Sequence, residues 1–267
     1  MITFPHCKFN LGLNVKFKRE DGFHEIETIM VPLPFKDILE IVPAPNFQFN
    51  SSGISIPGDK NDNLCVKAYN LFKKDFQIPT VAIHLHKNIP LGAGLGGGSS
   101  NGSFTLVMLN ELFDLKITNQ ILKQYAALLG SDCPFFIDNK IQLCTGRGEI
   151  TNDLSLDLSS FFVKLINPNL HVNTSEAYAN LDLTKPSNTL EDIIARPLGD
   201  WKKSLKNDFE DSVFKKYPIL AVIKNKLYEE GALYASMSGS GSTMIGLFKT
   251  EPKLSFRDFG LEKIIQL

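Results

Sequence analysis

The chain has 267 residues, 43% of them hydrophobic, and a formal net charge of −1. This apolar content is enough for one large or two modest globular domains, and the balanced charge argues against a basic surface for nucleic acid or membranes. The first residues contain no apolar signal-peptide core, no apolar run approaches eighteen residues, and the four cysteines have no C-x-x-C spacing. We therefore expect a cytoplasmic protein with reduced thiols, no structural zinc site and a small-molecule partner.

The first predicted element is a strand near the N-terminus. Phe9, Leu11 and Leu13 alternate with Lys8 and Asn10, which places Lys8 and Asn10 on one face of the strand. A lone lysine on a strand is ordinarily solvated. Beside a carboxylate it would instead keep the carboxylate ionised and orient a nucleophile, because an opposite charge favours the charged form. The residues leave both interpretations open.

A turn follows at Asp21-Gly22, within the segment DGFH. These turn residues predict a hairpin. Phe23 and His24 then have two interpretations: the phenyl ring packs and the histidine lies exposed, as in an ordinary hairpin, or the two rings stack on and hydrogen-bond a flat heterocycle.

Further elements of the first half follow from hydrophobic periodicity. The pattern predicts strands at 37–43 and 80–86 and helices at 62–76, 99–113 and 118–129.

The segment IPLGAGLGGGSSNGSF, residues 89–104, is a glycine-rich loop between a strand and a helix, with Ser99, Ser100 and Asn101 as candidate N-caps. Backbone N–H groups of such a loop converge, and the helix dipole adds positive potential, so the segment predicts a phosphate-binding site. The segment does not fit the dinucleotide-binding motif, because no acidic residue follows at the end of a next strand. It does not fit a Walker loop either, because that loop would need lysine where Gly98 stands. A glycine turn used only for close packing is the alternative.

Asp132 lies in the segment LGSDCPFF, after the helix at 118–129, which Gly130 closes. An aspartate at such a junction is ordinarily a cap or turn residue. Near an anion site its carboxylate could instead accept the proton of an attacking hydroxyl. The choice depends on which residues surround it.

The polar stretch at 151–160 predicts a boundary between two domains, 1–152 and 153–267. The glycine-serine segment SMSGSGSTMIG (236–246) is either a flexible turn or a second small-residue surface against which phosphates or the first glycine loop pack. The second half also has a predicted strand in FFVKLINP, helices near 174–181, 188–195 and 212–230, and a last strand in TMIGLF. Strands and helices interleave without a regular βαβ order, which favours the α+β class.

Together, the segments KFNLGL, DGFH, PLGAGLGGGSSN, GSDCPFF and NDFE (207–210) resemble the GHMP kinase superfamily, named for galactokinase, homoserine kinase, mevalonate kinase and phosphomevalonate kinase. The phosphate loop of that superfamily has the form P-x-x-x-G-L-G-S/G-S-S, and PLGAGLGGGSS matches it. Within the superfamily, the segments are similar to the kinases of the non-mevalonate isoprenoid pathway (MEP pathway). The resemblance covers nearly the whole chain, and the segments agree in order and spacing.

The resemblance implies a two-domain α+β GHMP kinase fold, with an active site in the cleft between an N-terminal ATP-binding domain and a C-terminal substrate-side domain. It implies phosphorylation of the C2 hydroxyl of 4-diphosphocytidyl-2-C-methyl-D-erythritol by ATP, with Mg2+ as cofactor and no obligatory protein partner. Asp132 would accept the hydroxyl proton, while Lys8 would keep Asp132 charged and orient the hydroxyl.

The resemblance also assigns binding residues at matching positions. Ser100 is a candidate ligand of the metal, whose other protein ligands stay unknown. A cytosine ring would lie between Phe23 and Tyr178 and be recognised on its edge by His24. The substrate-binding residues are Asn10, Phe23, His24, Thr174 and Tyr178; the ATP-binding residues are Asn63, Lys87, Pro90, Leu91, Gly92, Ala93, Gly94, Leu95, Gly96, Gly97, Gly98, Ser99, Ser100 and Asn101.

Two positions depart from the pattern of the superfamily. Pro5 is followed by His6 and Cys7 where Pro-Ala is expected, and Phe23 stands where tyrosine is common. Two other functions stay open: another GHMP kinase, of the homoserine or mevalonate type, and a catalytically silent nucleotide-binding protein of this fold. DGFH and GSDCPFF argue against the first, and Lys8, Asp132 and the intact loop argue against the second.

Overall fold

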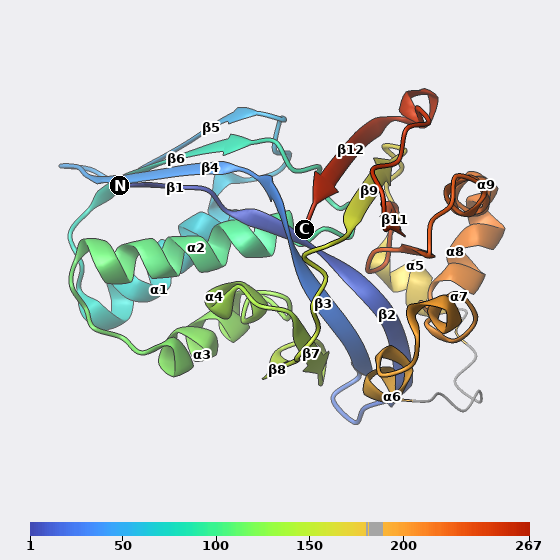
Figure 1. Ribbon diagram of the computed structural model, residues 1–267. Helices are drawn as coiled ribbons and strands as arrows, with labels where there is room; N and C mark the ends of the chain where they lie inside the picture. Colours follow the sequence, from blue (N-terminus) through green and yellow to red (C-terminus); the bar gives the residue numbers. More distant parts are fainter. Residues whose placement is uncertain (180, 182–188) are drawn as a thin grey trace. The chain divides into compact units, whose positions relative to one another are not determined.

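The computed structural model describes residues 1–179, 181 and 189–267. Helices and strands interleave along the chain, which confirms the α+β class (Figure 1). The chain forms two compact units, each assembled from separate segments. Unit 1 comprises residues 1–7, 35–91 and 96–140, and unit 2 comprises residues 8–34, 92–95 and 141–267. The chain therefore passes between the units several times, and the division predicted between residues 152 and 153 stays a prediction.

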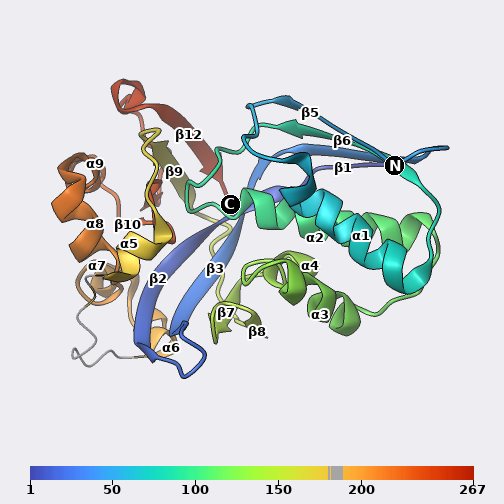
Figure 2. The same cartoon turned by 180° about the vertical axis from the view of Figure 1, so that it is seen from behind.

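Unit 1 is built on a sheet with two helices on one face. The strand order is β1 (Ile2–Thr3), β4 (Ile38–Pro43), β6 (Val81–Lys87), β5 (Gln48–Gly53). Alternate residues of β6 are buried, as its period predicts, and they pack in one core with α1 (Leu64–Phe76) and α2 (Gly97–Leu112), which lie on the same side of the sheet in Figure 1 and Figure 2. The other elements of this unit are η1 (Lys60–Asp62), α3 (Asn119–Leu129) and α4 (Phe135–Asp138).

The start of α2 differs from the prediction. The helix begins at Gly97, and its N-cap is Gly96, whose φ of 65° is a left-handed conformation that glycine adopts without strain. Ser99, Ser100 and Asn101 are therefore the third to fifth residues of the helix, and the prediction that they are N-caps is wrong. Since Gly96 has no side chain, the first backbone N–H groups of α2 have no side-chain cap.

Unit 2 contains two sheets. Strands β2 (His6–Lys18) and β3 (His24–Lys36) form the predicted hairpin, in which the Arg19 amide donates to the Phe23 carbonyl at 2.8 Å. The first two residues of β2 and the last two of β3 belong to unit 1. Strands β7 (Gln142–Thr145) and β8 (Ile150–Asp153) complete this sheet. The second sheet has the order β10 (Tyr234–Met237), β11 (Met244–Phe248), β9 (Phe162–Asn167), β12 (Leu261–Gln266).

Helices α8 (Glu210–Lys216) and α9 (Pro218–Glu229) form one core with residues of β10 and β11. The remaining helices of unit 2 are α5 (Thr174–Ala179), α6 (Leu190–Ile194), η2 (Leu198–Asp200), α7 (Trp201–Ser204) and η3 (Arg257–Phe259). In the part of the chain that the structure describes, every helix is too short or too polar to cross a membrane.

Two predictions for the second half are wrong. The single helix predicted at 212–230 is two helices, because Pro218 has no N–H to continue a helix and begins α9 instead. The segment TMIGLF is β11 but is not the last strand, since β12 follows and pairs with β9. Residues 180 and 188, at the ends of two other predicted helices, lie outside the described residues.

Candidate active site

The N-terminal end of α2 has the geometry of an anion site. Gly94 and Gly96 have φ values of 77° and 65°, a left-handed backbone conformation that residues other than glycine rarely adopt. The uncapped N–H groups and the helix dipole concentrate positive potential there. Ser100 in the first turn is fully buried, and its hydroxyl has no hydrogen-bond partner among the described residues. A polar atom in this state can bind a ligand.

A buried ionic cluster lies beside the first turn of α2. Lys87 at the end of β6 is 1% exposed and forms an ion pair with the fully buried Asp37. Its Nζ also donates to Asn101 Oδ1 at 3.2 Å, and Asn101 Nδ2 donates to Asp37 Oδ2 at 2.8 Å. A Cβ atom added to Gly97 would lie 2.9 Å from Lys87 Nζ, so the ammonium group lies against the start of the helix.

Asp37 anchors this cluster. Its Oδ1 accepts hydrogen bonds from the backbone amides of Asn88 and Ile89 at 2.7 and 2.9 Å. Burial lowers the pKa of Lys87, while the charge of Asp37 and its hydrogen bond oppose that shift. Sequence reasoning missed Asp37, because an aspartate at the start of a strand is also typical of an ordinary turn.

Asp132 lies in the predicted turn after α3. The next residue, Cys133, is tied to α2, because Ser103 Oγ donates to the Cys133 carbonyl at 2.7 Å and the Ser99 side chain hydrogen-bonds the Cys133 thiol. Burial, assisted by the charge of Asp132, raises the pKa of Cys133 to about 12, so the thiol stays protonated. Asp132 itself is half-buried. The turn that carries Asp132 is therefore tied to α2 through the next residue.

Lys8 lies in unit 2 and is 3% exposed, so the interpretation as a solvated lysine is wrong. Its Nζ donates to Asn10 Oδ1 at 2.7 Å and to the Gly94 carbonyl at 3.1 Å. Its backbone amide donates to the Leu95 carbonyl at 3.0 Å. Lys8 and Asn10 share one face of β2, as predicted, and this face contacts the glycine loop.

The segment 236–246 packs against the same loop, which confirms this part of its second interpretation, while packing against phosphates stays a prediction. Ser238 Oγ donates to the Gly94 carbonyl at 2.9 Å, and the Thr243 amide donates to the Ala93 carbonyl at 3.3 Å. A Cβ atom added to Gly94 would lie 1.9 Å from the Ser238 carbonyl oxygen. A larger residue at position 94 would therefore be strained by its φ and would displace one of the two backbones that meet there.

Three rings of unit 2, those of His24, Tyr178 and Phe209, are in contact. The rings of His24 and Tyr178 are 4.6 Å apart at 17°, and Tyr178 contacts Phe209 edge to face at 4.7 Å. Phe23 is 53% exposed, with the Arg147 guanidinium 4.8 Å from its ring centre. Burial, together with the charge of Lys18, lowers the pKa of His24, which keeps the ring neutral near pH 7.

Comparison with known proteins decides the family. The model of the GHMP kinases N terminal domain matches residues 63–140, and that of the GHMP kinases C terminal region matches residues 189–256. The chain is 46% identical to 4-diphosphocytidyl-2-C-methyl-D-erythritol kinase of Bacteroides fragilis (strain YCH46), covering 97% of this chain and 96% of that one. It is 50% identical to the enzyme of that name from Azobacteroides pseudotrichonymphae genomovar. CFP2, covering 93% and 94%. The chain belongs to the GHMP kinases.

Solved structures agree with this family. The crystal structure of 4-(cytidine 5'-diphospho)-2C-methyl-D-erythritol kinase superposes with a TM-score of 0.79 at 31% identity, covering 92% of this chain and 90% of that one. Homoserine kinase from Cytophaga hutchinsonii superposes with a TM-score of 0.67 at 18% identity, covering 92% and 85%, which shows a shared fold alone. The chain is thus a small-molecule kinase, and a kinase of this family uses ATP as its substrate.

The structure brings some predicted site residues of this GHMP kinase together. Lys87 and Asn101 meet in the Asp37 cluster, while Lys8 and Asn10 meet at Gly94. Asn63 caps α1 by accepting from the Cys65 amide at 2.9 Å. Thr174, the first residue of α5, has its hydroxyl 3.0 Å from that of Ser240.

Other predicted pairings of the GHMP kinase stay predictions. Lys8 belongs to unit 2 and Asp132 to unit 1. The stacking of a base on Tyr178 also stays a prediction, and in the structure the His24 ring occupies one face of Tyr178.

Proposed function

We propose that this GHMP kinase transfers the γ-phosphoryl group of ATP to the C2 hydroxyl of 4-diphosphocytidyl-2-C-methyl-D-erythritol, in the MEP pathway of isoprenoid precursor biosynthesis. The observation that carries the proposal is the identity of 46% and 50% to kinases of that name over nearly the whole of both chains. The buried Lys8 and the helix that begins at the glycine loop supply groups that such a reaction requires.

In the proposed reaction, the C2 oxygen of the substrate attacks the γ-phosphorus, and the bond from that phosphorus to the bridging oxygen of ADP breaks. Asp132 accepts the proton of the C2 hydroxyl, and the Lys8 ammonium keeps Asp132 ionised and orients the hydroxyl. Gly94 and Asn10 hold Lys8 Nζ by its carbonyl and side-chain oxygens, at 3.1 and 2.7 Å. Fixed charges of this kind provide most of the catalysis in phosphoryl transfer, where the protein forms no covalent bond.

The phosphates of ATP are proposed to bind at residues 90–101, where the N–H groups at the start of α2 point out of the helix. The donors present also fit a magnesium ion, because Mg2+ takes few protein oxygens and completes its shell with phosphates and water. Ser100 Oγ, buried and without a partner among the described residues, would hold the ion. The described residues contain no cluster of three or more His, Cys, Asp or Glu side chains suited to a metal. When bound, the ion would neutralise charge on the phosphates.

A cavity of about 510 Å³ in unit 1 is proposed to hold the nucleoside of ATP. It is lined by residues 47–50 and 59–61 and by Val66. The first residue of α1, Leu64, lies against Gly102 of α2, because a Cβ atom added there would be 2.9 Å from Leu64 Cβ. Gly102 is five residues after the start of α2, a rise of about 7.5 Å along that helix, and Val66, two residues after Leu64, lines the cavity.

On the substrate side, the cytosine ring is proposed to stack between Phe23 and Tyr178 and to bond His24. A neutral imidazole has one donor and one acceptor nitrogen, which suits the amide-like edge of cytosine. The His24 ring would have to leave the face of Tyr178 for the base to bind there. We also propose that the enzyme works in the cytoplasm without nucleic acid, membrane or obligatory protein partner, as its near-neutral charge favours.

The test is ADP release by the purified protein with ATP and magnesium, offered the cytidine compound, homoserine or mevalonate. We expect turnover of the cytidine compound alone. Asp132→Asn and Lys8→Met should each lower kcat by a factor on the order of 10² to 10⁴, as loss of a proton acceptor and its partner does. Asp114 and Lys116 form an ion pair at 3.4 Å with side chains 81% and 77% exposed, so Asp114→Asn and Lys116→Met are matched controls that should keep full activity.

Each other result has a definite meaning. Turnover of homoserine or mevalonate would refute the proposed substrate and keep the kinase. The absence of turnover with all three alcohols would refute the proposed activity and favour a silent nucleotide-binding protein.

A further inference from the structure

The segment 236–242 carries the hydroxyl that fixes the glycine loop beside Lys8. Ser238 Oγ donates to the Gly94 carbonyl at 2.9 Å and lies 3.3 Å from Asn10 Oδ1. These two oxygens are also the acceptors of Lys8 Nζ. The position of Ser238 therefore sets the position of both oxygens that hold the ammonium group.

Within itself, this segment has little to hold it in place. Gly239 and Gly241 both have positive φ, at 56° and 94°. Because glycine has more conformational freedom in the unfolded chain than any other residue, ordering these two positions is costly. Two hydrogen bonds close the turn, from the Ser238 amide to the Thr243 carbonyl and from the Gly241 amide to the Ser238 carbonyl. The first half of the segment ends strand β10, where Ser236 and Met237 pair with Ile245 and Met244 of β11. Its Met237 backbone also bonds side chains from elsewhere in unit 2.

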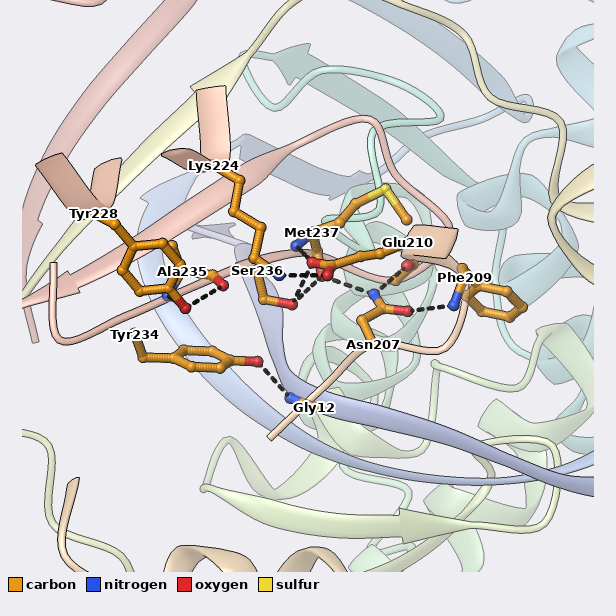
Figure 3. Close-up of polar contacts among 11 residues, drawn as sticks. Gly12, Asn207, Phe209, Glu210, Lys224, Tyr228, Tyr234, Ala235, Ser236 and Met237 are labelled. Carbon is orange, nitrogen blue, oxygen red and sulfur yellow. Dashed lines mark hydrogen bonds and ion pairs between the residues drawn. The ribbon is translucent and has the colours of Figure 1, made fainter. Parts of the chain in front are cut away.

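Two buried side chains, Asn207 and Glu210, hold that first half (Figure 3). Asn207 Nδ2 donates to the carbonyls of Met237 and Gly239, each at 2.8 Å, while its Oδ1 accepts from the Phe209 amide at 3.0 Å. These bonds fix the orientation of the Asn207 amide, because reversing it would place Oδ1 against two carbonyl oxygens.

Glu210 completes the arrangement from the first turn of α8. Its Oε1 accepts from the Met237 amide at 2.8 Å and from Ser236 Oγ at 3.0 Å. Its Oε2 forms an ion pair with Lys224 of α9. Figure 3 shows the Glu210 carboxyl group and the Asn207 amide on neighbouring parts of the Met237 backbone. Burying a carboxylate is costly unless it is paired and hydrogen-bonded, and here its bonds go to the segment that carries Ser238.

We infer that Asn207 and Glu210 are positioning residues of the kinase: by fixing the backbone of residues 237–239 they place Ser238, and through Gly94 and Asn10 they orient the Lys8 ammonium. This inference rests on the proposed role of Lys8. A displacement of about 1 Å at a reacting group can cost a factor on the order of 10² in rate, so a small shift of this segment is enough to matter.

The variants Asn207→Asp, Glu210→Ala and Glu210→Gln test the inference in the full-length protein. Asn207→Asp has the same shape but cannot donate to the two carbonyls. Glu210→Gln keeps an acceptor oxygen for Met237, whereas Glu210→Ala does not. Ser212→Ala is the matched control, because Ser212 lies on the same helix and donates to the carbonyls of Ala177 and Phe209 instead.

We expect Asn207→Asp and Glu210→Ala to lower kcat by a factor of about 10 to 100, with KM for either substrate changed by less than about threefold. Amide hydrogen exchange should become faster in both 236–242 and 92–95. Glu210→Gln should restore most of kcat, and Ser212→Ala should change neither readout.

Faster exchange in 236–242 with none in 92–95 would overturn the inference, as would an equal loss of kcat in Glu210→Gln and Glu210→Ala. If the wild type has no kinase activity, the proposed function fails, and the exchange of residues 92–95 still decides whether Asn207 and Glu210 position the glycine loop.

Discussion

The buried pair of Asp37 and Lys87 predicts a large and specific loss of stability when only one partner is changed. Asp37 accepts four hydrogen bonds: from Lys87, from Asn101 and from two backbone amides. In Asp37→Asn, the amide oxygen can keep the two backbone bonds, but its NH2 group faces Lys87 and Asn101. Loss of the bond from Lys87 at about 1.5–3 kcal/mol and of the bond from Asn101 at about 1 kcal/mol gives about 2.5–4 kcal/mol, which overlaps the 3–5 kcal/mol typical of a broken buried pair.

Urea unfolding of the purified variants measures this loss. Asp37→Asn should lower the free energy of unfolding by about 2.5–4 kcal/mol at pH 7. The double variant Asp37→Asn with Lys87→Met should be more stable than Asp37→Asn alone, because no unpaired charge stays buried.

The pH dependence supplies a second check. Without Asp37 the pKa of the buried Lys87 falls further below 10.5, so the unfolded state binds more protons than the folded state and stability rises with pH. The deficit of Asp37→Asn should therefore shrink between pH 7 and pH 10. A loss below about 1 kcal/mol, or a double variant whose loss equals the sum of the single losses, would refute the reasoning.

Three further predictions concern single residues. Gly94→Ala should lower kcat by more than about tenfold while the protein still folds by circular dichroism, because its Cβ would meet the Ser238 carbonyl at 1.9 Å; unchanged steady-state kinetics would contradict this. Burial lowers the pKa of His6 below 6.5. As the pH falls from 6.5, His6 is protonated in the unfolded chain but not in the folded protein, which lowers the free energy of unfolding. His6→Gln should therefore have a flatter pH dependence of urea unfolding below pH 6.5, by up to about 1.4 kcal/mol per pH unit, and an identical slope would exclude this cause. Tyr178→Ala should raise KM for the cytidine substrate more than KM for ATP in steady-state assays, since it removes a stacking surface; a larger rise for ATP would count against it.

Much of the first half of the chain follows from sequence pattern. The alternation in β6, the helical periodicity of 118–129 and the turn at Asp21-Gly22 are local signals, and the structure has the corresponding elements. Local reasoning failed at α2, because glycines are poor helix formers by propensity and yet the helix includes Gly97 and Gly98. Gly97 allows the close approach of Lys87 and Ile89, which no local rule contains, whereas nothing lies within 4 Å of a Cβ atom added to Gly98.

The supporting residues of the candidate site were harder to predict. Lys8, Asp132 and the glycine loop stand in recognisable motifs, whereas Asp37 is separated from Lys87 by 50 positions and has no motif of its own. Asn207 and Glu210 lie in the segment NDFE, but nothing in that segment indicates that their partners are the backbone atoms of residues 237–239. A side chain that acts on backbone leaves no complementary residue to look for.

The contact of Gly94 with Ser238 and Gly239 has a consequence for engineering this kinase. A Cβ atom at Gly239 would lie 3.4 Å from Gly94 Cα, so the two loops are in close contact and their shapes are complementary. Exchanging one glycine loop for that of a relative would pair two surfaces shaped for different neighbours. In chimeras, residues 92–95 and 236–242 should therefore be exchanged together. Directed-evolution libraries should likewise vary both segments at once.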